Sequence, residues 1–296
     1  MRIAVVGLGI MGLPMSLNLV RAGFGVAGYT RTPARGRPLS DAGGTLTASL
    51  AEAVSEADAV VTVLPDSPDV LDVYTGAGGV LALAAPGTLL LEMSTIRPDV
   101  ARDLHERAAE ASLPMLDAPV SGGEAGAREG TLSIMCGGAP ETLERARPVL
   151  EAMGSTIVGV GGPGSGQTVK AANQLLVAGT IELVSEALVF LDAHGVDLAP
   201  AVDVLGGGLA GSAVLARKSG AMLAGDFTPG FRVDLHHKDL GIYGAAARDK
   251  GVFSPAGALV AELMAALRAS GAGGLDHSAL LAQVAKLSGD QRWTVA

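Results

Sequence analysis

The sequence has little cysteine, few aromatic residues and few lysines. Its one cysteine, Cys136, excludes an internal disulfide or a cysteine-rich metal site and fits a reducing compartment. Aromatic residues make up 3% of the 296 positions, so the hydrophobic cores are expected to be aliphatic. Lysine occurs five times, and the first, Lys170, comes after more than half of the chain.

Blocks of basic charge and long uncharged apolar runs are also missing. The net charge is −9 with no basic cluster, which argues against nucleic acid or an anionic membrane as a partner. The start, "MRIAVVGLGIMG", is too short an apolar run for a signal peptide. The most apolar later run, 175–191, carries Glu182 and Glu186 and is a poor membrane span. We expect a cytoplasmic protein.

The length and the alternation of patterns predict two domains. Single cores usually stop growing at roughly 250 to 300 residues. Residues 1–162 alternate short apolar runs with helical segments, which predicts a doubly wound α/β domain with a parallel sheet covered on both faces. In this interpretation "PMLDAPV" is one strand, and "TLSIMCGG" and "STIVGVGG" extend the strand pattern.

Residues 163–296 show helical patterns and no plausible strand, so the second domain is expected to be all-α. One helix of about 28 residues should begin after Gly166 and stop at Gly195. Further helices are expected in "LAPAVDVLGG", "GSAVLARKSGAML", "VDLHHKDLGIYGAAARDKG" and "AGALVAELMAALRASG".

A glycine-rich turn follows the first apolar run. Gly7, Gly9 and Gly12 form G-x-G-x-x-G, with Ile10 and Met11 inside the motif, after "RIAVV" and at the start of a helix. The glycines allow a tight turn, approach of a pyrophosphate to the backbone and close helix packing. The motif predicts dinucleotide binding; the alternative in a chain with 42 glycines is a purely structural turn.

The end of the second apolar run bears on the choice of dinucleotide. NAD sites usually have an acidic residue about 20 positions after the motif. Here Thr30, Arg31 and Thr32 follow "GVAGY", and a guanidinium between two hydroxyls suits a 2′-phosphate. We therefore expect NADP, with NAD possible; the alternative is that Arg31 is simply solvated.

Two polar groups stand out as candidates for catalysis. Lys170, Asn173 and Gln174 share one face of the long helix, and an ammonium desolvated there could give a proton to a substrate near neutral pH. The alternative is a lysine that snorkels from a half-exposed helix. The second group, "SGG" at 121–123, offers a hydroxyl and uncovered backbone amides to an anion such as a carboxylate, unless it is only a glycine-rich loop.

Four segments together resemble the β-hydroxyacid dehydrogenases. They are "GLGIMGLPMSLNLVRAG", "DAPVSGGEAGAREGTLSIMCGG", "GSGQTVKAANQ" and "FRVDLHHKDLGI", in order and properly spaced over almost the whole chain. The resemblance implies a Rossmann-type NADP-binding domain at 1–162. It also implies an all-helical substrate and oligomerisation domain at 163–296, a long interdomain helix, and an active site in the cleft between the domains.

The resemblance also implies roles for individual residues. Lys170 would be the general acid and base, and Asn173 would hold the substrate and position the lysine. The substrate carboxylate would be bound by Ser121, Gly122 and Gly123, with Gln174 also at the substrate. The cofactor would further contact Leu64, Pro65, Thr95 and Lys238, with Asp239 ordering the segment around Lys238.

Departures from the family pattern narrow the expected activity. Gln174 stands where many members have a second asparagine, a variant that resembles the tartronate semialdehyde (2-hydroxy-3-oxopropionate) reductases, and "VDLHHKDL" also looks closer to those reductases than to the hydroxyisobutyrate enzymes. Lys170 argues against an imine reductase. The expected reaction is NADPH-dependent reduction of a small carboxylate-bearing semialdehyde, without a metal. The alternatives are a 3-hydroxyisobutyrate dehydrogenase, a glyoxylate or succinic semialdehyde reductase, or a module that senses the dinucleotide without turnover.

Several other residues are expected to be structural. His236 and His237 point about 100 degrees apart on a helix and should pack or face solvent; the alternative is that one of them lines the cleft. Cys136 should be a buried small apolar residue. Glu182 and Glu186 are expected to pair with arginines at a helix or subunit contact; the alternative is a second acid/base pair. The apolar run 175–191 predicts a homodimer or homotetramer.

Overall fold

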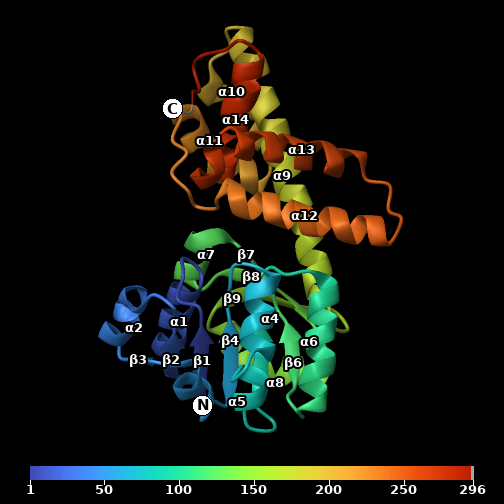
Figure 1. Cartoon of the computed structure of the whole chain (residues 1–296). Helices are drawn as coiled ribbons and strands as arrows, with labels where there is room; N and C mark the ends of the chain where they lie inside the picture. The colour runs from blue at the N-terminus through green and yellow to red at the C-terminus, as the bar shows by residue number, and fades with distance from the viewer. Residues whose placement is uncertain (295–296) are drawn as a thin grey trace. The chain divides into compact units, whose positions relative to one another are not determined.

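The computed structural model describes residues 1–294 and divides into two compact units. The N-terminal unit runs from Met1 to Lys170, and the C-terminal unit begins at Ala171. Figure 1 shows the elements of both units in chain order. The division falls inside one continuous helix, α9 (Ser165–Ala193), instead of in the loop before it.

The N-terminal unit is built on one sheet, which contains nine strands among the described residues, in the order β3-β2-β1-β4-β5-β6-β8-β7, with β9 paired to β8. Strands β1 to β6 run parallel to one another. They are β1 (Arg2–Val6), β2 (Gly25–Tyr29), β3 (Thr45–Leu46), β4 (Ala59–Thr62), β5 (Leu89–Glu92) and β6 (Met115–Asp117).

The predicted parallel sheet is confirmed for β1 to β6, and the other end of the sheet also contains antiparallel pairs. Strand β8 (Leu132–Gly137) runs antiparallel to β6 and to β7 (Val120–Ser121), and β9 (Gly154–Gly161) pairs parallel with β8. The segment "PMLDAPV" also splits into β6 and β7, because Pro119 between them has no N–H to donate to a ladder.

Both faces of the sheet are covered by helices, as the alternation of patterns predicts. One buried cluster joins alternate residues such as Ile3 and Val61 to α1, α7 and α8, and the other joins Ala4 and Val60 to α3, α4, α5 and α6. The helices of this unit are α1 (Gly12–Arg21), α2 (Arg37–Asp41), α3 (Leu50–Val54), α4 (Ser67–Thr75), α5 (Val80–Leu83), α6 (Pro98–Glu110), α7 (Gly123–Glu129) and α8 (Pro140–Glu151).

Helix α9 has 29 residues and ends before Gly195, whose φ of +69° only glycine adopts easily, so the predicted long helix is confirmed. By length and composition alone α9 would be able to cross a membrane, with a mean hydropathy of 1.7 in its most apolar stretch. The buried core helices of soluble proteins pass the same test.

The C-terminal unit is helical, as predicted; up to residue 294 its strand-like pairing is a single bridge between Arg232 and Asp276. After α9 come α10 (Leu198–Gly206), α11 (Ala213–Ala224), α12 (Val233–Asp249), α13 (Pro255–Ala269) and α14 (Leu280–Leu287). The core of this unit is aliphatic apart from Phe227 and Trp293. Helix α14 lies outside the predicted helices.

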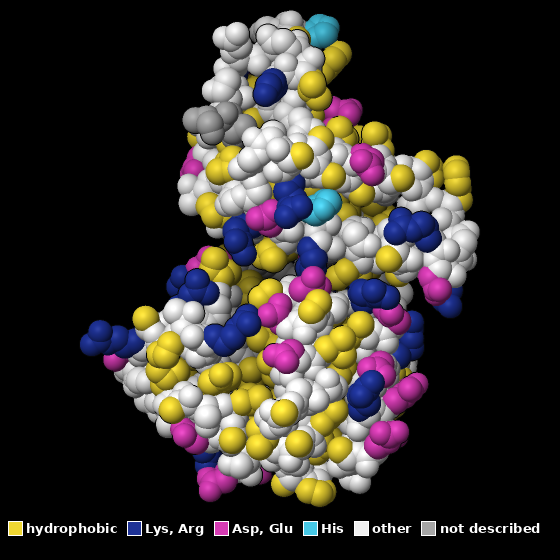
Figure 2. All heavy atoms as spheres, in the orientation of Figure 1, with side chains coloured by type: hydrophobic (Ala, Val, Ile, Leu, Met, Phe, Trp, Pro, Cys, Tyr) yellow, Lys and Arg dark blue, Asp and Glu magenta, His cyan; other side chains and the backbone are white. Residues whose placement is uncertain are grey.

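Charged side chains of both signs are interspersed on the face shown in Figure 2. No large area of one sign stands out there, which agrees with the absence of basic clusters in the sequence.

Candidate active site

The glycine motif forms the turn between β1 and α1. Gly7 has a φ of +102°, and a Cβ there would lie 2.2 Å from the carbonyl oxygen of Val63; a Cβ at Gly12 would lie 1.9 Å from that of Gly7. A Cβ at Gly9 would have no atom within 4 Å. The first and third glycines are therefore required by the fold itself, whereas Gly9 leaves open space in front of the backbone.

Helix α1 begins behind this open space with uncovered amides. Its N-cap, Met11, makes no side-chain capping bond, and the first turn carries no acidic residue. Ile10 is 57% exposed at the tip of the turn. The first amides of a helix and its positive dipole end attract phosphate. These residues fit the pyrophosphate of a dinucleotide.

The other predicted cofactor residues follow neighbouring parallel strands. Thr30 comes after β2, Leu64 and Pro65 after β4, and Thr95 after β5, so all of them lie at the carboxyl edge of the sheet. The chain winds away in opposite directions from β1 and β4, and such switch points are where open α/β sheets bind ligands. The Leu64 amide donates to Ser94 Oγ at 2.8 Å, which fixes the loop after β4.

Arg31 extends from the end of β2 into solvent. Its guanidinium donates to Asp69 of α4 at 3.0 Å, and its side chain is 76% exposed. An exposed pair of this kind contributes little to stability, so the guanidinium can exchange Asp69 for another anion. Arg35 and Arg37 follow in the next turn, and both are exposed. The sequence analysis missed these two arginines, although the spacing "RTPARGR" was visible.

The predicted carboxylate loop lies between β7 and α7. Gly122 and Gly123 have φ angles of +140° and +66°, which favour glycine at both positions. Ser121 is the last residue of β7 and is half-buried. The chain then turns at once into α7, so the backbone after Ser121 enters the first turn of a helix with no side-chain cap.

The start of α9 is anchored in the N-terminal unit by three buried side chains that the sequence analysis did not single out. Asp117, at the end of β6, accepts hydrogen bonds from the amides of Gly164 and Gln167 at 2.8 and 2.9 Å. The Gln167 amide group donates to Glu92 Oε2 at 3.0 Å and accepts from the Ile96 amide at 3.0 Å. The partners are far apart in sequence, so no local pattern reveals them.

Lys170 lies one turn after Gln167 on α9 and is only 6% exposed. A charged ammonium is desolvated at such a position and interacts strongly with any nearby oxygen. The alternative of a lysine that snorkels into water is therefore not supported.

Asn173 and Gln174 continue the same face of α9, and their amides are oriented by a carboxylate. Gln174 Nε2 donates to Asp239 Oδ2 at 2.6 Å, and Asn173 Nδ2 donates to Gln174 Oε1 at 2.8 Å. Since a carboxylate only accepts, this chain fixes which end of each amide faces which neighbour. Lys238, on α12, forms an ion pair with Asp239 at 2.8 Å and is 18% exposed.

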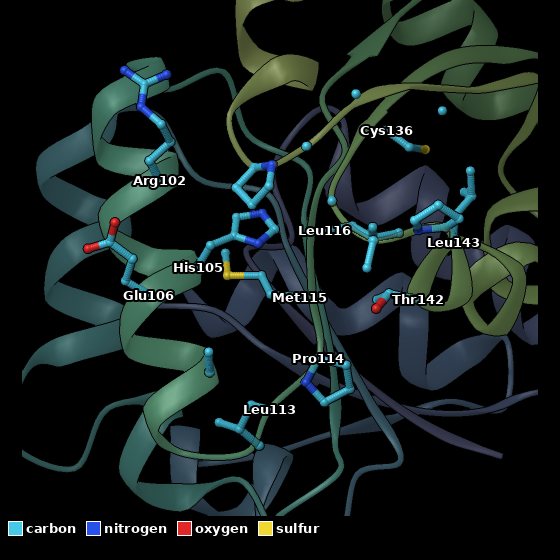
Figure 3. A pocket seen from close by; sticks show the side chains of 18 of the residues that line it. Arg102, His105, Glu106, Leu113, Pro114, Met115, Leu116, Cys136, Thr142 and Leu143 are labelled. Carbon is cyan, nitrogen blue, oxygen red and sulfur yellow. The ribbon is translucent and has the colours of Figure 1, made fainter.

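A groove of the N-terminal unit lies away from these residues. It encloses about 1220 Å³ between α6 and α8, and no residue predicted to bind cofactor or substrate lines it. Figure 3 shows His105 of α6 on one side of this groove and Thr142 and Leu143 of α8 on the other, with Met115 and Leu116 between them. His105 Nε2 lies 3.1 Å from Asp117 Oδ1, so this groove adjoins the anchor of α9.

The residues expected to be structural give mixed outcomes. Cys136 is buried as predicted, and burial raises the pKa of its thiol to about 12. No arginine of the described residues of this chain hydrogen-bonds to Glu182 Oε2, which has no partner within residues 1–294, and an arginine at a subunit contact stays a prediction. Burial, and then repulsion from Glu186, raise the pKa of Glu182 to about 7. His236 is fully buried and hydrogen-bonded, as described below.

Groups of three histidine, cysteine, aspartate or glutamate side chains placed to hold a metal do not occur in the described part of the chain.

Comparison with known proteins identifies the family. A family model described as the NAD binding domain of 6-phosphogluconate dehydrogenase matches residues 2–162. A second, described as NAD-binding of NADP-dependent 3-hydroxyisobutyrate dehydrogenase, matches residues 164–284. The chain is 41% identical over 282 residues to the 2-hydroxy-3-oxopropionate reductase of Escherichia coli (strain K12), which covers 95% of this chain and 96% of that protein.

Two further proteins are similar to this chain over almost its whole length. The NAD-dependent L-serine dehydrogenase of Pseudomonas aeruginosa is 38% identical over 284 residues, covering 94% of this chain and 95% of that protein. The solved structure of Mycobacterium tuberculosis 3-hydroxyisobutyrate dehydrogenase with L-serine has a TM-score of 0.86 at 37% identity, and the match covers 96% of this chain and 98% of that one. The chain belongs to the β-hydroxyacid dehydrogenases and is an oxidoreductase that uses a nicotinamide dinucleotide.

Proposed function

We propose that this protein reduces a small carboxylate-bearing semialdehyde to the hydroxyacid with NADPH, and catalyses the reverse oxidation, most like 2-hydroxy-3-oxopropionate reductase. The observation that carries the proposal is the buried Lys170 on α9, followed one turn later by the oriented amide of Asn173. The 41% identity to a protein of that name supports the choice of substrate.

In this proposal each residue has a chemical task. Bound NADPH supplies the hydride that goes to the carbonyl carbon. The Lys170 ammonium stabilises the negative charge that develops on the carbonyl oxygen and gives that oxygen a proton. Asn173 holds the substrate and positions the Lys170 side chain. Ser121 and the backbone of Gly122 and Gly123 bind the carboxylate, which aligns the carbonyl by orientation.

The domain roles in the proposal follow the family. Residues 1–162 bind the cofactor, and residues 163–296 serve the substrate and oligomerisation. Gln174 is assigned to the substrate, and Leu64, Pro65, Thr95 and Lys238 to the cofactor. We also assign the protein to the cytoplasm; recovery in the periplasmic or membrane fraction would contradict this.

The role of Lys170 is tested by Lys170→Met. The variant should bind NADPH normally by fluorescence and lose turnover by about 100- to 10,000-fold, the range for a missing general acid. Lys250→Met is the matched control, because Lys250 is 75% exposed beside Asp249. Near-full turnover of Lys170→Met would contradict the role.

Substrate and cofactor are tested in one panel of initial rates. The reductive substrates are tartronate, methylmalonate and succinate semialdehydes and glyoxylate, each with NADPH and NADH, and L-serine is added as an oxidative substrate because of the two relatives above. Tight NADPH binding without any turnover would favour a dinucleotide-sensing module instead.

The preference for NADP rests on Arg31, with Arg35 and Arg37 nearby and no acidic residue between Thr30 and Ser40. Arg31→Ala should raise the KM for NADPH and leave that for NADH unchanged. Arg21→Ala is the control, since Arg21 ends α1 and is exposed. A strong preference of the native protein for NADH would overturn this part of the proposal.

We further propose that α9 packs against a second copy of this chain, in a homodimer or homotetramer. Exposed apolar side chains recur every seven residues along the helix, at Val169, Leu176, Leu183 and Phe190, with exposures of 38, 69, 67 and 62%. A repeat of seven keeps one stripe on one side of a helix and is the spacing by which helices pack on each other. Small residues beside the stripe, such as Gly179 and Ala187, favour close approach.

A further inference from the structure

A chain of buried polar side chains crosses the core of the C-terminal unit and ends on α9. Its central members are His236 of α12 and His277, which are 0% and 5% exposed. His236 Nε2 lies 3.0 Å from the backbone oxygen of Gln174, and its Nδ1 lies 2.8 Å from Nδ1 of His277. Phe231 lies edge-on to both rings, with centroids 5.5 Å away.

The partners fix where the protons are. A backbone oxygen only accepts, so His236 must carry a proton on Nε2. Two facing ring nitrogens can share only one proton, so His236 Nδ1 accepts and His277 Nδ1 donates. The pair therefore holds its geometry with His236 neutral, and a second proton on His236 Nδ1 would set two N–H groups against each other.

The series of buried polar side chains ends, on the side away from α9, at the carboxylate of Asp276, which accepts several hydrogen bonds. Asp276 accepts from Lys218 Nζ at 2.8 and 2.9 Å, and from the amides of Gly230 and Phe231 at 2.9 and 3.0 Å. Burial alone would raise the pKa of Asp276, but the charge of His277, and bonds from Lys218 and Ser278, hold it well below its usual range. The carboxylate lies 3.9 Å from His277 Nε2, so it attracts positive charge to that ring and away from His236.

The near end is Gln174, which is bonded at both its backbone and its side chain. His236 binds its backbone oxygen, Asp239 accepts from its Nε2, and Asn173 donates to its Oε1. The Asn173 Nδ2 group is therefore used in the bond to Gln174, and Asn173 Oδ1 points away from Gln174 Oε1.

We propose that the His236–His277 pair is a positioning device for the active site: it holds the α9 backbone at Gln174 so that Asn173 keeps one amide orientation toward the substrate. This inference rests on the proposed function for its effect on turnover. His236 and His277 are positioning residues, because they act through Gln174 and Asn173.

The proposal includes a dependence on pH. The charged groups around the pair are Asp276 and Lys218 at the His277 end, and Asp239 and Lys238 at the Gln174 end. Acid that adds a second proton to His236, at Nδ1, breaks the hydrogen bond between the two rings and releases the backbone oxygen of Gln174. Turnover should therefore fall in acid with an inflection that belongs to the pair.

The kinetic test compares His236→Gln with His236→Leu. Glutamine places an N–H where Nε2 stands but cannot titrate, and leucine fills the volume without a donor. His236→Leu should lower kcat by about 10- to 100-fold, the range for a misplaced reacting group, with NADPH binding unchanged. His236→Gln should keep kcat within threefold of the native protein and lack the acid inflection. Native kcat in His236→Leu, or an unchanged acid inflection in His236→Gln, would overturn the proposal.

A second measurement does not need turnover. In protein labelled with ¹⁵N-histidine, five imidazoles are visible, and His236 should show a protonated Nε2 and His277 a protonated Nδ1. In a second sample, labelled with ¹⁵N-asparagine, the side-chain NH₂ signal of Asn173, assigned by its loss in Asn173→Asp, should shift in His236→Leu and stay in place in His236→Gln. If the protein turned over no substrate in the panel, the proposed function would fail. These NMR signals would still show whether the His236–His277 pair positions Asn173. An unshifted Asn173 signal in His236→Leu would refute it.

Discussion

Replacing Asp117 by asparagine should destabilise the N-terminal unit although the side chain keeps its shape. Asp117 is fully buried and accepts three hydrogen bonds: from the amides of Gly164 and Gln167, and from His105. Both carboxylate oxygens are used, and the bonds to the two amides hold the first turn of α9. Asparagine has one oxygen only, so its NH₂ group must face at least one backbone N–H.

The size of the effect follows from these bonds. A hydrogen bond to a charged group is worth about 1.5 to 3 kcal/mol, and an unpaired buried N–H costs about 1 to 3 kcal/mol. Losing one such bond and the charge on the others should lower the free energy of unfolding by about 3 kcal/mol. For a unit of this size that corresponds to a melting temperature lower by about 6 to 12 °C.

Calorimetry and urea unfolding measure the loss, and hydrogen exchange should show less protection at the amides of 164–170. Asp99→Asn is the matched control: Asp99 is 54% exposed and pairs with Arg97, so its loss should cost less than about 1 kcal/mol. If Asp117→Asn unfolded within 0.5 kcal/mol of the native protein, in the range of ordinary surface substitutions, the anchoring of α9 by Asp117 would be refuted.

Four further outcomes are expected. Gly9→Ala should keep the native melting temperature but weaken NADPH binding at least about tenfold, since its Cβ enters open space, whereas Gly12→Ala should lower the melting temperature. Leu183→Arg should shift the mass measured by light scattering to that of one chain; an unchanged oligomer would contradict the α9 stripe. Glu182→Gln should raise stability at pH 8 and change nothing near pH 4.5, because a folded-state pKa of about 7 destabilises the native state only as pH rises above the ordinary value. Cys136 should resist thiol reagents at pH 8 until the protein is unfolded, given its burial and pKa.

The sequence predicted those features of the fold that depend on neighbouring residues along the chain. The turn at Gly7 to Gly12 and the stop of α9 at Gly195 depend on backbone angles that glycine favours, and the strands of the parallel half are continuous apolar runs. The antiparallel edge depends on Pro119 and on the turn at Gly122, where one missing N–H and one positive φ redirect the chain. An apolar pattern does not record the direction of a strand.

The parts of the site that escaped prediction are held by contacts between distant segments. Asp117 bonds to residues 47 and 50 positions away, and His236 bonds to a ring 41 positions away. Burial, too, is visible only in the fold: Glu182 was expected to face an arginine, but its place on α9 turns it inward. The assigned roles of Lys170, Asn173 and Ser121 stay predictions until the variants are measured.

The anchor of α9 limits how the chain can be taken apart. A fragment that ended at residue 162 would contain the whole sheet and every predicted cofactor residue except Lys238. It would also contain Asp117 and Glu92, two fully buried carboxylates, without the Gly164 and Gln167 groups that bond to them. A stable fragment of the N-terminal unit, or an exchange of C-terminal units between relatives, therefore needs its junction inside α9, beyond Gln167. A junction at the boundary between the two units keeps Lys170 with the N-terminal unit.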